Sequence, residues 1–215
     1  MSINHIVRQG EHLSQIALNY GFRDYKIIWD HPDNAALKKL RKSPNVLMPG
    51  DTLRIPDKVQ KQESCATSRT HRFTLHGGKL FLRLALRDFD NKPLANTECE
   101  LKIEGASKPL VTDGKGLINV PISPTVTEAT LTFKDPLVPF DVSVPIKIGH
   151  LDPVEELSGQ KARLSNLGYI TRPIEGVDDT IFAQTVQEFQ CDSGLHVTGV
   201  CDAVTQAKLK ELHGS

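Results

Sequence analysis

The stretch that decides the fold of the C-terminal part is "VQEFQCDSGLHVTG", residues 186–199. It begins inside a predicted helix, because Phe182, Val186 and Phe189 recur at i, i+4 and i+7. Gly194 follows, and the leucine after it can fold back onto the helix, which is typical of a glycine helix cap. The stretch therefore predicts a core helix that ends at a glycine, followed by a turn into another helix.

The same pattern occurs upstream in "ARLSNLGYITRPIEG", residues 162–176. Gly168 and Tyr169 repeat the glycine cap, and Asp202 is the expected N-cap of a last helix. The apolar residues expected to face the core in these two helices are Val154, Leu157, Leu164, Leu167, Val204, Leu209 and Leu212. Three short helices that share one small core are therefore predicted for residues 151–215.

These stretches, with Thr205 and Leu209, resemble the type 1 peptidoglycan-binding domain over roughly residues 153–213. That family repeats L-x-x-L-G-Y, A-V-x-x-F-Q, G-L-x-x-x-G and T-x-x-x-L. The resemblance implies a three-helix fold with a glycan-binding surface, although several such domains are docking modules, so both roles stay open. The candidate glycan contacts in this domain are Tyr169, Asp178 and Asp179.

The N-terminal part begins with "IVRQGEHLSQIALNYGF", residues 6–22, which predicts a short strand, a helix and another glycine cap. A second helix is expected after Asp24, burying Ile28 and Trp29. The spacing of Trp29 with Ile28 favours a core residue over the alternative, a sugar-stacking one. The closing stretch "LMPGDTLRIP", residues 47–56, predicts a Pro-Gly turn and a final strand.

This pattern resembles a lysin-motif (LysM) domain, V-x-x-G-[DE]-x-L-x-x-I-A-x-x-x-G and then L-x-P-G-[DQ]-x-L-x-I-P, over residues 3–56. The resemblance implies a βααβ fold with two loops that bind the N-acetyl groups of glucosamine-containing glycans. The residues mapped to these loops are Gly10, Glu11, His12, Leu13, Asn45, Val46, Leu47 and Met48. The stretch at 31–46 is longer than usual and predicts added helical residues with Leu37 and Leu40.

The middle of the chain changes to a period of two, which indicates strands. The clearest examples are residues 79–87, "KLFLRLALR", and residues 97–105, "TECELKIEG", and Asp113-Gly114 is a hairpin signal. One apolar face per strand predicts an antiparallel β-sandwich. Its layout is similar to transthyretin-like and other immunoglobulin-like modules, which act as spacers or docking platforms.

Taken together, the patterns predict a multidomain α+β protein. A LysM-like domain is expected at residues 1–56, a linker at 57–70, a β-sandwich at 71–150 and a peptidoglycan-binding-like three-helix domain at 151–215. Lys and Arg together number 26, as do Asp and Glu, so the formal net charge is zero. Nucleic acids and anionic membranes attract basic surfaces, so neither is an expected partner.

The start of the chain, "MSINHIVRQG", has no apolar signal core, which predicts a cytoplasmic protein and leaves delivery to the periplasm or a target cell by a signal-independent injection system open. The cysteines are too few and scattered for a disulfide scaffold. Cys191 and Cys201 bracket one predicted loop, so both a bond and two free thiols remain open.

No pattern of a wall-cutting enzyme is found. A zinc peptidase needs clustered ligands, and the eight histidines form no such local pattern. The cysteines lie in no nucleophile motif. Asp178-Asp179 is the one suggestive acidic pair, for which a solvated turn is the favoured interpretation. We therefore expect no catalytic residue, no metal and no cofactor.

The leading hypothesis is a non-catalytic protein that binds peptidoglycan or another N-acetylglucosamine-containing glycan. The combination of modules resembles accessory proteins of contractile injection machines, such as type VI secretion spikes, which implies an adaptor for a spike or its effector. The alternatives are a docking adaptor that binds only protein, and a cryptic cell-wall hydrolase.

Overall fold

The computed structural model describes residues 3–59, 64–72, 80–88, 92–134, 139–169 and 180–214. The chain divides into two compact units, one of residues 1–45 with 49–150 and one of residues 46–48 with 151–215. It is a mixed α+β protein with antiparallel sheets and a helical C-terminal region, as the sequence predicts. Every helix within the described ranges is too short or too polar to cross a lipid bilayer.

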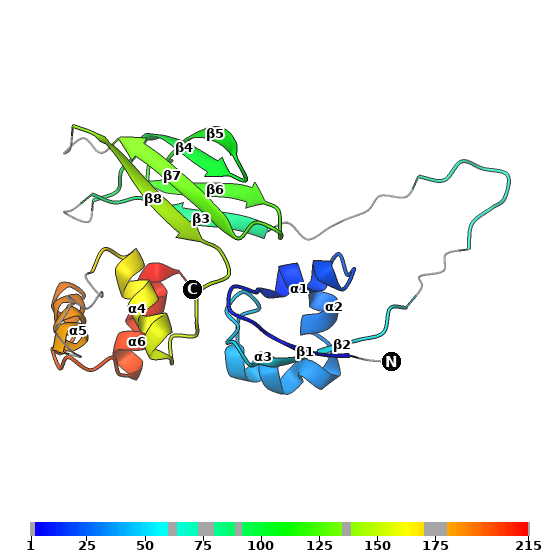
Figure 1. Ribbon diagram of the computed structural model, residues 1–215, viewed down its shortest axis with the longest axis horizontal. Helices are drawn as coiled ribbons and strands as arrows, with labels where there is room; N and C mark the ends of the chain where they lie inside the picture. The colour runs from blue at the N-terminus through cyan, green and yellow to red at the C-terminus, as the bar shows by residue number, and fades with distance from the viewer. Residues whose placement is uncertain are drawn as a thin grey trace. The chain divides into compact units, whose positions relative to one another are not determined.

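The first 56 residues place two strands beside short helices (Figure 1). The elements are β1 (Ile3–Ile6), α1 (Leu13–Asn19), α2 (Lys26–Trp29), a 3-10 turn (Pro32–Asn34), α3 (Ala35–Arg41) and β2 (Thr52–Ile55). Strands β1 and β2 pair antiparallel, with His5 opposite Leu53. Trp29 is only 5% exposed, so the core interpretation of this residue is confirmed and sugar stacking by its ring is excluded.

The added residues at 31–46 form the 3-10 turn and α3, as the sequence predicts. Leu40 is 62% exposed, so this helix is not held by burial of that leucine. Instead, Arg41 Nε and Nη2 each donate to one carboxylate oxygen of Asp51 at 2.8 Å. Both side chains are largely shielded from water, and such two-pronged ion pairs are stronger than single exposed ones. The ion pair therefore fastens α3 to the turn that precedes β2.

A buried amide ties the same region together. Asn34 is 2% exposed, and its Nδ2 donates to the carbonyls of Ile28 and Arg54, both at 2.8 Å. Its Oδ1 accepts from the Arg54 N–H at 2.8 Å. One side chain thus satisfies three backbone groups on α2 and β2, which fixes the distance between these elements.

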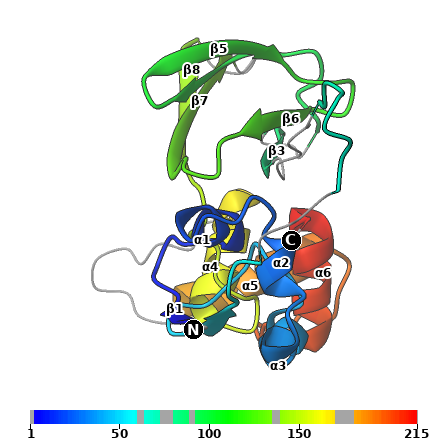
Figure 2. The ribbon, with the colours of Figure 1, turned by 90° about the vertical axis from the view of Figure 1, so that its right-hand side faces the viewer.

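Two antiparallel sheets follow, and Figure 2 shows them one above the other. The smaller contains β3 (Leu80–Ala85) and β6 (Leu117–Ile122), and the larger has the order β5 (Ala106–Val111), β4 (Glu98–Ile103), β7 (Glu128–Lys134) and β8 (Asp141–Lys147). They share one core whose buried members are Leu86, Leu94, Cys99, Leu101, Ile118, Val120, Ala129 and Leu131. Two antiparallel sheets with a common core are compatible with the predicted sandwich, and both the sandwich and the transthyretin-like assignment stay predictions.

The hairpin predicted at Asp113-Gly114 is wrong. Strand β6 pairs with β3 and not with β5, so this turn carries the chain from one sheet to the other. The reason is the Asp113 side chain, whose Oδ1 accepts from the N–H groups of Lys115 and Leu117 at 2.8 and 2.9 Å. These bonds hold the pKa of the Asp113 carboxyl below its ordinary value and stabilise a local turn without any strand pairing.

The two-residue hairpin lies instead at Glu104-Gly105, between β4 and β5. Both residues have positive φ, +49° and +83°, as a type I′ turn requires. An L-residue with a side chain rarely adopts this conformation, so Glu104 is a weaker sequence signal than the Asn or Asp usually found there.

The described residues of the C-terminal unit form three helices, α4 (Leu157–Asn166), α5 (Thr180–Asp192) and α6 (Ala203–His213) (Figure 1). Its buried core contains Val154, Leu164, Val186, Phe189 and Leu209. Val154 precedes α4, whereas Leu157, the first residue of α4, is 48% exposed. Helix α6 turns Thr205 and Leu209 inward, and the expectation that Leu157, Val204 and Leu212 face the core is wrong.

The segment before α4 is fastened to that helix by a buried cation. Arg163 is 1% exposed, and its Nη1 donates to the carbonyls of Asp152 and Gly159 at 2.8 and 2.9 Å. A Cβ added to Gly159 would collide with the carbonyl oxygen of Pro153. The close approach of backbone to backbone therefore requires glycine at this position.

The three predicted glycine caps are confirmed. Gly21, Gly168 and Gly194 have φ of +74°, +96° and +66°. In each case the N–H after the glycine donates to the carbonyl five residues back. The three bonds are Phe22 to Ala17 at 2.8 Å, Tyr169 to Leu164 at 3.0 Å and Leu195 to Gln190 at 2.8 Å. This is the Schellman motif, which satisfies helix carbonyls and places an apolar residue against the helix.

Replacing Asn34 by Ala should lower the free energy of unfolding of the first 56 residues by about 2–3 kcal/mol, because it leaves buried carbonyls and an N–H unpaired. Hydrogen exchange of the amides in β1 and β2 measures this loss. The amides of β4 and β7 serve as the internal control and should keep their protection. Unchanged exchange in β2 would contradict the role assigned to this side chain.

A second prediction concerns pH. Burial, and then the charge of Arg163, lower the pKa of His213 to about 4, and Asn166 Nδ2 donates to His213 Nε2 at 3.0 Å. The folded state thus keeps this imidazole neutral, so its stabilising contribution is complete above pH 6.5 and is lost as pH falls towards 4. In His213→Asn, the urea midpoint of α4 and α6 signals should depend less on pH between 7 and 5. Equal slopes in both proteins would refute the assignment.

Candidate glycan-binding surfaces

The loop between α5 and α6 is built around one buried side chain, Gln190, which is 1% exposed. Its Oε1 accepts from the N–H groups of Thr198 and Gly199 at 2.8 and 3.0 Å. Its Nε2 lies within 3.1 Å of three acceptors, namely Thr198 Oγ1, the Val200 carbonyl and Thr205 Oγ1. These polar groups of the loop are therefore hydrogen-bonded to Gln190, which fixes the shape of the loop.

The same network continues into the start of α6. Asp202 Oδ1 accepts from the Thr205 N–H at 2.9 Å and from Thr205 Oγ1 at 2.8 Å, which confirms the predicted N-cap. The bond from the Thr205 N–H, and after it the bond from the Thr205 hydroxyl, hold the pKa of the Asp202 carboxyl below its ordinary value. Gln190 and Asp202 thus meet at the Thr205 hydroxyl and join the loop to the helix.

The outside of this loop carries apolar side chains. Val197 and Val200 in the loop and Val204 in the first turn of α6 are 49%, 62% and 63% exposed. A rigid loop with exposed apolar side chains can contact an acetamido group or a short peptide, since such sites are lined mainly by apolar surface. The sequence pattern does not predict this surface, because the helical spacing puts Val204 on the core face.

Tyr169, a candidate contact from the sequence, is part of the closing cap. Its ring meets the Phe189 ring edge-on at a centroid distance of 5.6 Å, and its hydroxyl donates to Asp192 Oδ2 at 3.0 Å. Burial and the neighbouring Asp192 raise the pKa of Tyr169 to about 12. The other two candidates, Asp178 and Asp179, lie outside the described residues.

The candidate loops of the N-terminal part are more buried than the sequence suggests. His12, Leu13, Val46 and Leu47 are 4%, 0%, 7% and 4% exposed. Burial lowers the pKa of His12. Gly10, Glu11 and Met48 are half-buried and Asn45 is exposed. Residues 10–13 and Asn45 belong to the first unit, whereas residues 46–48 belong to the second. Within the first unit, the candidate side chains that are not buried are those of Glu11 and Asn45.

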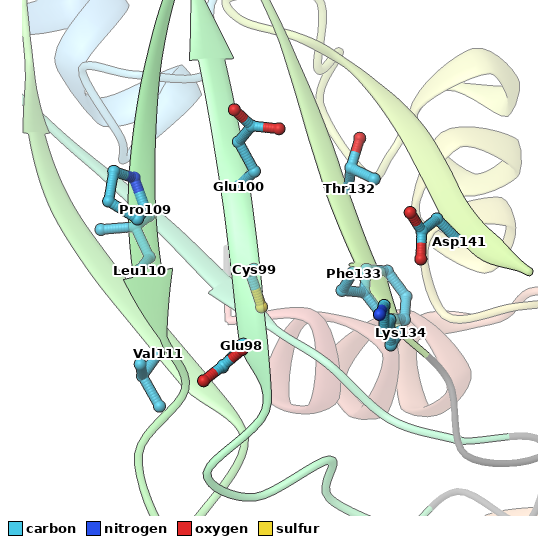
Figure 3. Close-up of a pocket in the computed structure, with 10 residues that line it drawn as sticks. All are labelled: Glu98, Cys99, Glu100, Pro109, Leu110, Val111, Thr132, Phe133, Lys134 and Asp141. Atoms are coloured by element: carbon cyan, nitrogen blue, oxygen red, sulfur yellow. The ribbon is translucent and has the colours of Figure 1, made fainter.

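A shallow hollow of about 580 Å³ lies on the larger sheet, and Figure 3 shows its lining along β4, β5, β7 and the start of β8. The charged side chains at this hollow are Glu98, Glu100, Lys134 and Asp141. All four are exposed, so water competes for each of them and nothing fixes a ligand there.

Among the described residues, no group of three or more His, Cys, Asp or Glu side chains is placed to hold a metal ion. All four cysteines are free, which decides between the two alternatives for Cys191 and Cys201. Burial and the charge of Asp202 raise the pKa of Cys201 to about 11, and burial raises that of Cys99. Neither of these two thiols has the lowered pKa of an activated nucleophile.

One part of the chain matches a known protein family. Residues 155–209 match the family model described as "Putative peptidoglycan binding domain". The matched segment runs from just before α4 to Leu209 of α6, so it includes the Gln190 network and two of the three glycine caps. The expected relationship to peptidoglycan-binding domains is confirmed for this part. No curated protein and no solved structure matches the chain.

Replacing Gln190 by Leu should lower the free energy of unfolding of the C-terminal unit by about 2–4 kcal/mol, because the size is kept while buried N–H and C=O groups lose their partners. Gln184→Leu, an exposed position on the same helix, is the matched control and should change little. Urea unfolding followed through resolved signals of α4 and α6 compares the two. Equal effects would show that the amide contributes nothing specific.

Proposed function

We propose that this protein is a non-catalytic peptidoglycan-binding protein whose C-terminal unit makes the main contact with the wall polymer. The family match at residues 155–209 carries the proposal, because peptidoglycan binding is what that family is described by. The fixed loop with exposed Val197, Val200 and Val204 is the contact surface we favour. Its apolar side chains suit the methyl groups of N-acetyl sugars or of alanine in a stem peptide.

The N-terminal part adds a second, weaker contact in this proposal. Its sequence resembles a LysM domain, and residues around Gly10 and Asn45 would bind the glycan mainly through backbone groups. Two weak sites on one chain raise the apparent affinity for a polymer when both can bind at once, as a connecting segment such as residues 57–70 would permit. Residues 57–59 and 64–70 are exposed, which suits a linker.

We place the protein with contractile injection machines, as an adaptor carried by a spike or its effector. The support is the combination of a LysM-like part, a two-sheet part and a peptidoglycan-binding-like part. In this role the protein is made in the cytoplasm and meets the wall only after delivery. Architecture alone supports this step, so the partner must come from a binding experiment.

A docking adaptor that binds no glycan is the second candidate, and one observation favours it for the N-terminal part. The side chains of His12, Leu13, Val46 and Leu47 are buried and so are not offered to a sugar ring. A cryptic hydrolase is the third candidate, and a turbidity assay on purified sacculi addresses it directly. The proposal predicts no clearance.

Sedimentation with purified sacculi tests the proposal. The full chain should be retained, and Val200→Asp combined with Val204→Asp should weaken retention by about tenfold, since charged groups replace apolar contacts. Leu157→Asp changes another exposed apolar residue of the same unit and is the matched control. Soluble wall fragments should release the bound protein. No retention of the unmodified chain, together with stable capture by an injection spike, would favour the docking candidate.

A further inference from the structure

Three polar side chains in the N-terminal part form a continuous chain that no role assigned above explains. They are Tyr20 at the end of α1, His5 on β1 and Glu11 in the loop before α1. The His5 Nδ1 lies 3.2 Å from the Tyr20 hydroxyl, and its Nε2 lies 2.9 Å from Glu11 Oε2. The rings of His5 and Tyr20 meet edge-on at 5.5 Å. Neighbouring groups thus hold the imidazole on both nitrogens and on one face.

The Glu11 carboxylate also forms a hydrogen bond with the backbone of its own loop. The same oxygen, Oε2, accepts from the Arg8 N–H at 2.8 Å, and the Glu11 N–H donates to the Arg8 carbonyl at 3.1 Å. Gly10, between them, has a φ of +86°, as the third position of a type II turn requires. The turn of residues 8–11 is therefore closed twice, once by its backbone and once by the Glu11 carboxylate.

The proton positions follow from the chemistry of the groups. An ionised carboxylate only accepts, so His5 Nε2 must donate to Glu11. In the neutral imidazole, Nδ1 then accepts from the Tyr20 hydroxyl. The side chains of His5 and Glu11 are only 15% and 21% exposed, so water competes weakly for these bonds. In this tautomer the hydrogen bonds run in one direction, from Tyr20 through His5 to Glu11.

We propose that His5 is a positioning residue for a glycan-binding turn at residues 8–11. The inference rests on the proposed function, in which this turn contacts N-acetylglucosamine-type sugars. A neutral sugar held by backbone N–H and C=O groups depends on the exact shape of the turn, because backbone groups have no rotamers with which to adapt. His5 orients the Glu11 carboxylate, and that carboxylate sets the shape of the turn.

A matched pair of variants separates this role from a purely structural tie between β1 and α1. In His5→Gln, the side-chain amide nitrogen occupies the place of Nε2 and can still donate to Glu11. In His5→Asn it occupies the place of Nδ1 and reaches only Tyr20. The expected affinity for tetra-N-acetylchitotetraose is near that of the unmodified chain for Gln and about tenfold lower for Asn, which corresponds to the loss of roughly one hydrogen bond to a charged group.

The measurement is a titration of the isotope-labelled full chain with that oligosaccharide, followed at the Gly10 and Glu11 amides. Imidazole nitrogen shifts provide a second readout, and His5 should be the Nε2–H tautomer. If the oligosaccharide shifts these amides and both variants bind equally, or if His5 carries its proton on Nδ1, the positioning role is overturned while glycan binding stands. If the unmodified chain shows no shifts at these amides, glycan binding by this turn fails and the positioning role with it.

Tyr20→Phe is a second test, which does not depend on the folding of the variants at residue 5. It keeps the ring and removes only the hydroxyl that fixes His5. We expect a smaller loss of affinity, about threefold, and unchanged protection of the Leu53 amide from hydrogen exchange. Full affinity in this variant would overturn the link between Tyr20 and the turn.

Discussion

One backbone hydrogen bond recurs at the points where this chain changes direction, from the N–H of an apolar residue behind a glycine to the carbonyl five residues earlier. It needs a left-handed residue in between, which costs most other residues about 1–2 kcal/mol. Gly21, Gly168 and Gly194 meet that need. Each bond ends a helix and seats the next apolar side chain, so the cores at both ends of the chain depend on where these glycines stand.

Two buried side-chain amides fix further parts of the backbone. Gln190 fixes the loop before α6, and Asn34 fixes the spacing of α2 and β2. In both cases one buried side chain satisfies several backbone groups that would otherwise have no hydrogen-bond partner. The consequence for recognition is that the backbone groups bonded to these two amides have a fixed position. Rigid loops of this kind lose little conformational entropy on binding, which suits weak contacts repeated along a polymer.

The sequence predicts local features well and long-range pairing poorly. The caps, the burial of Ile28 and Trp29 and the N-cap Asp202 follow from spacings of a few residues. The turn at Asp113-Gly114 was misassigned, because the partner of β6 lies over thirty residues upstream and leaves no trace in the turn itself. Gln190 was missed as the centre of its loop for a related reason. Polar side chains are usually expected at the surface, and only its partners in space show that it is buried.

The buried guanidinium of Arg163 has a mechanical consequence. It donates hydrogen bonds to the carbonyl of Asp152, where the chain enters the C-terminal unit, and to the carbonyl of Gly159 inside α4. A pulling force that arrives along the chain from residue 150 therefore meets these bonds, and the close contact at Gly159, before it reaches the apolar core. Tension along the chain would therefore load these hydrogen bonds of a buried charged side chain before it separates α4 from the rest of the core.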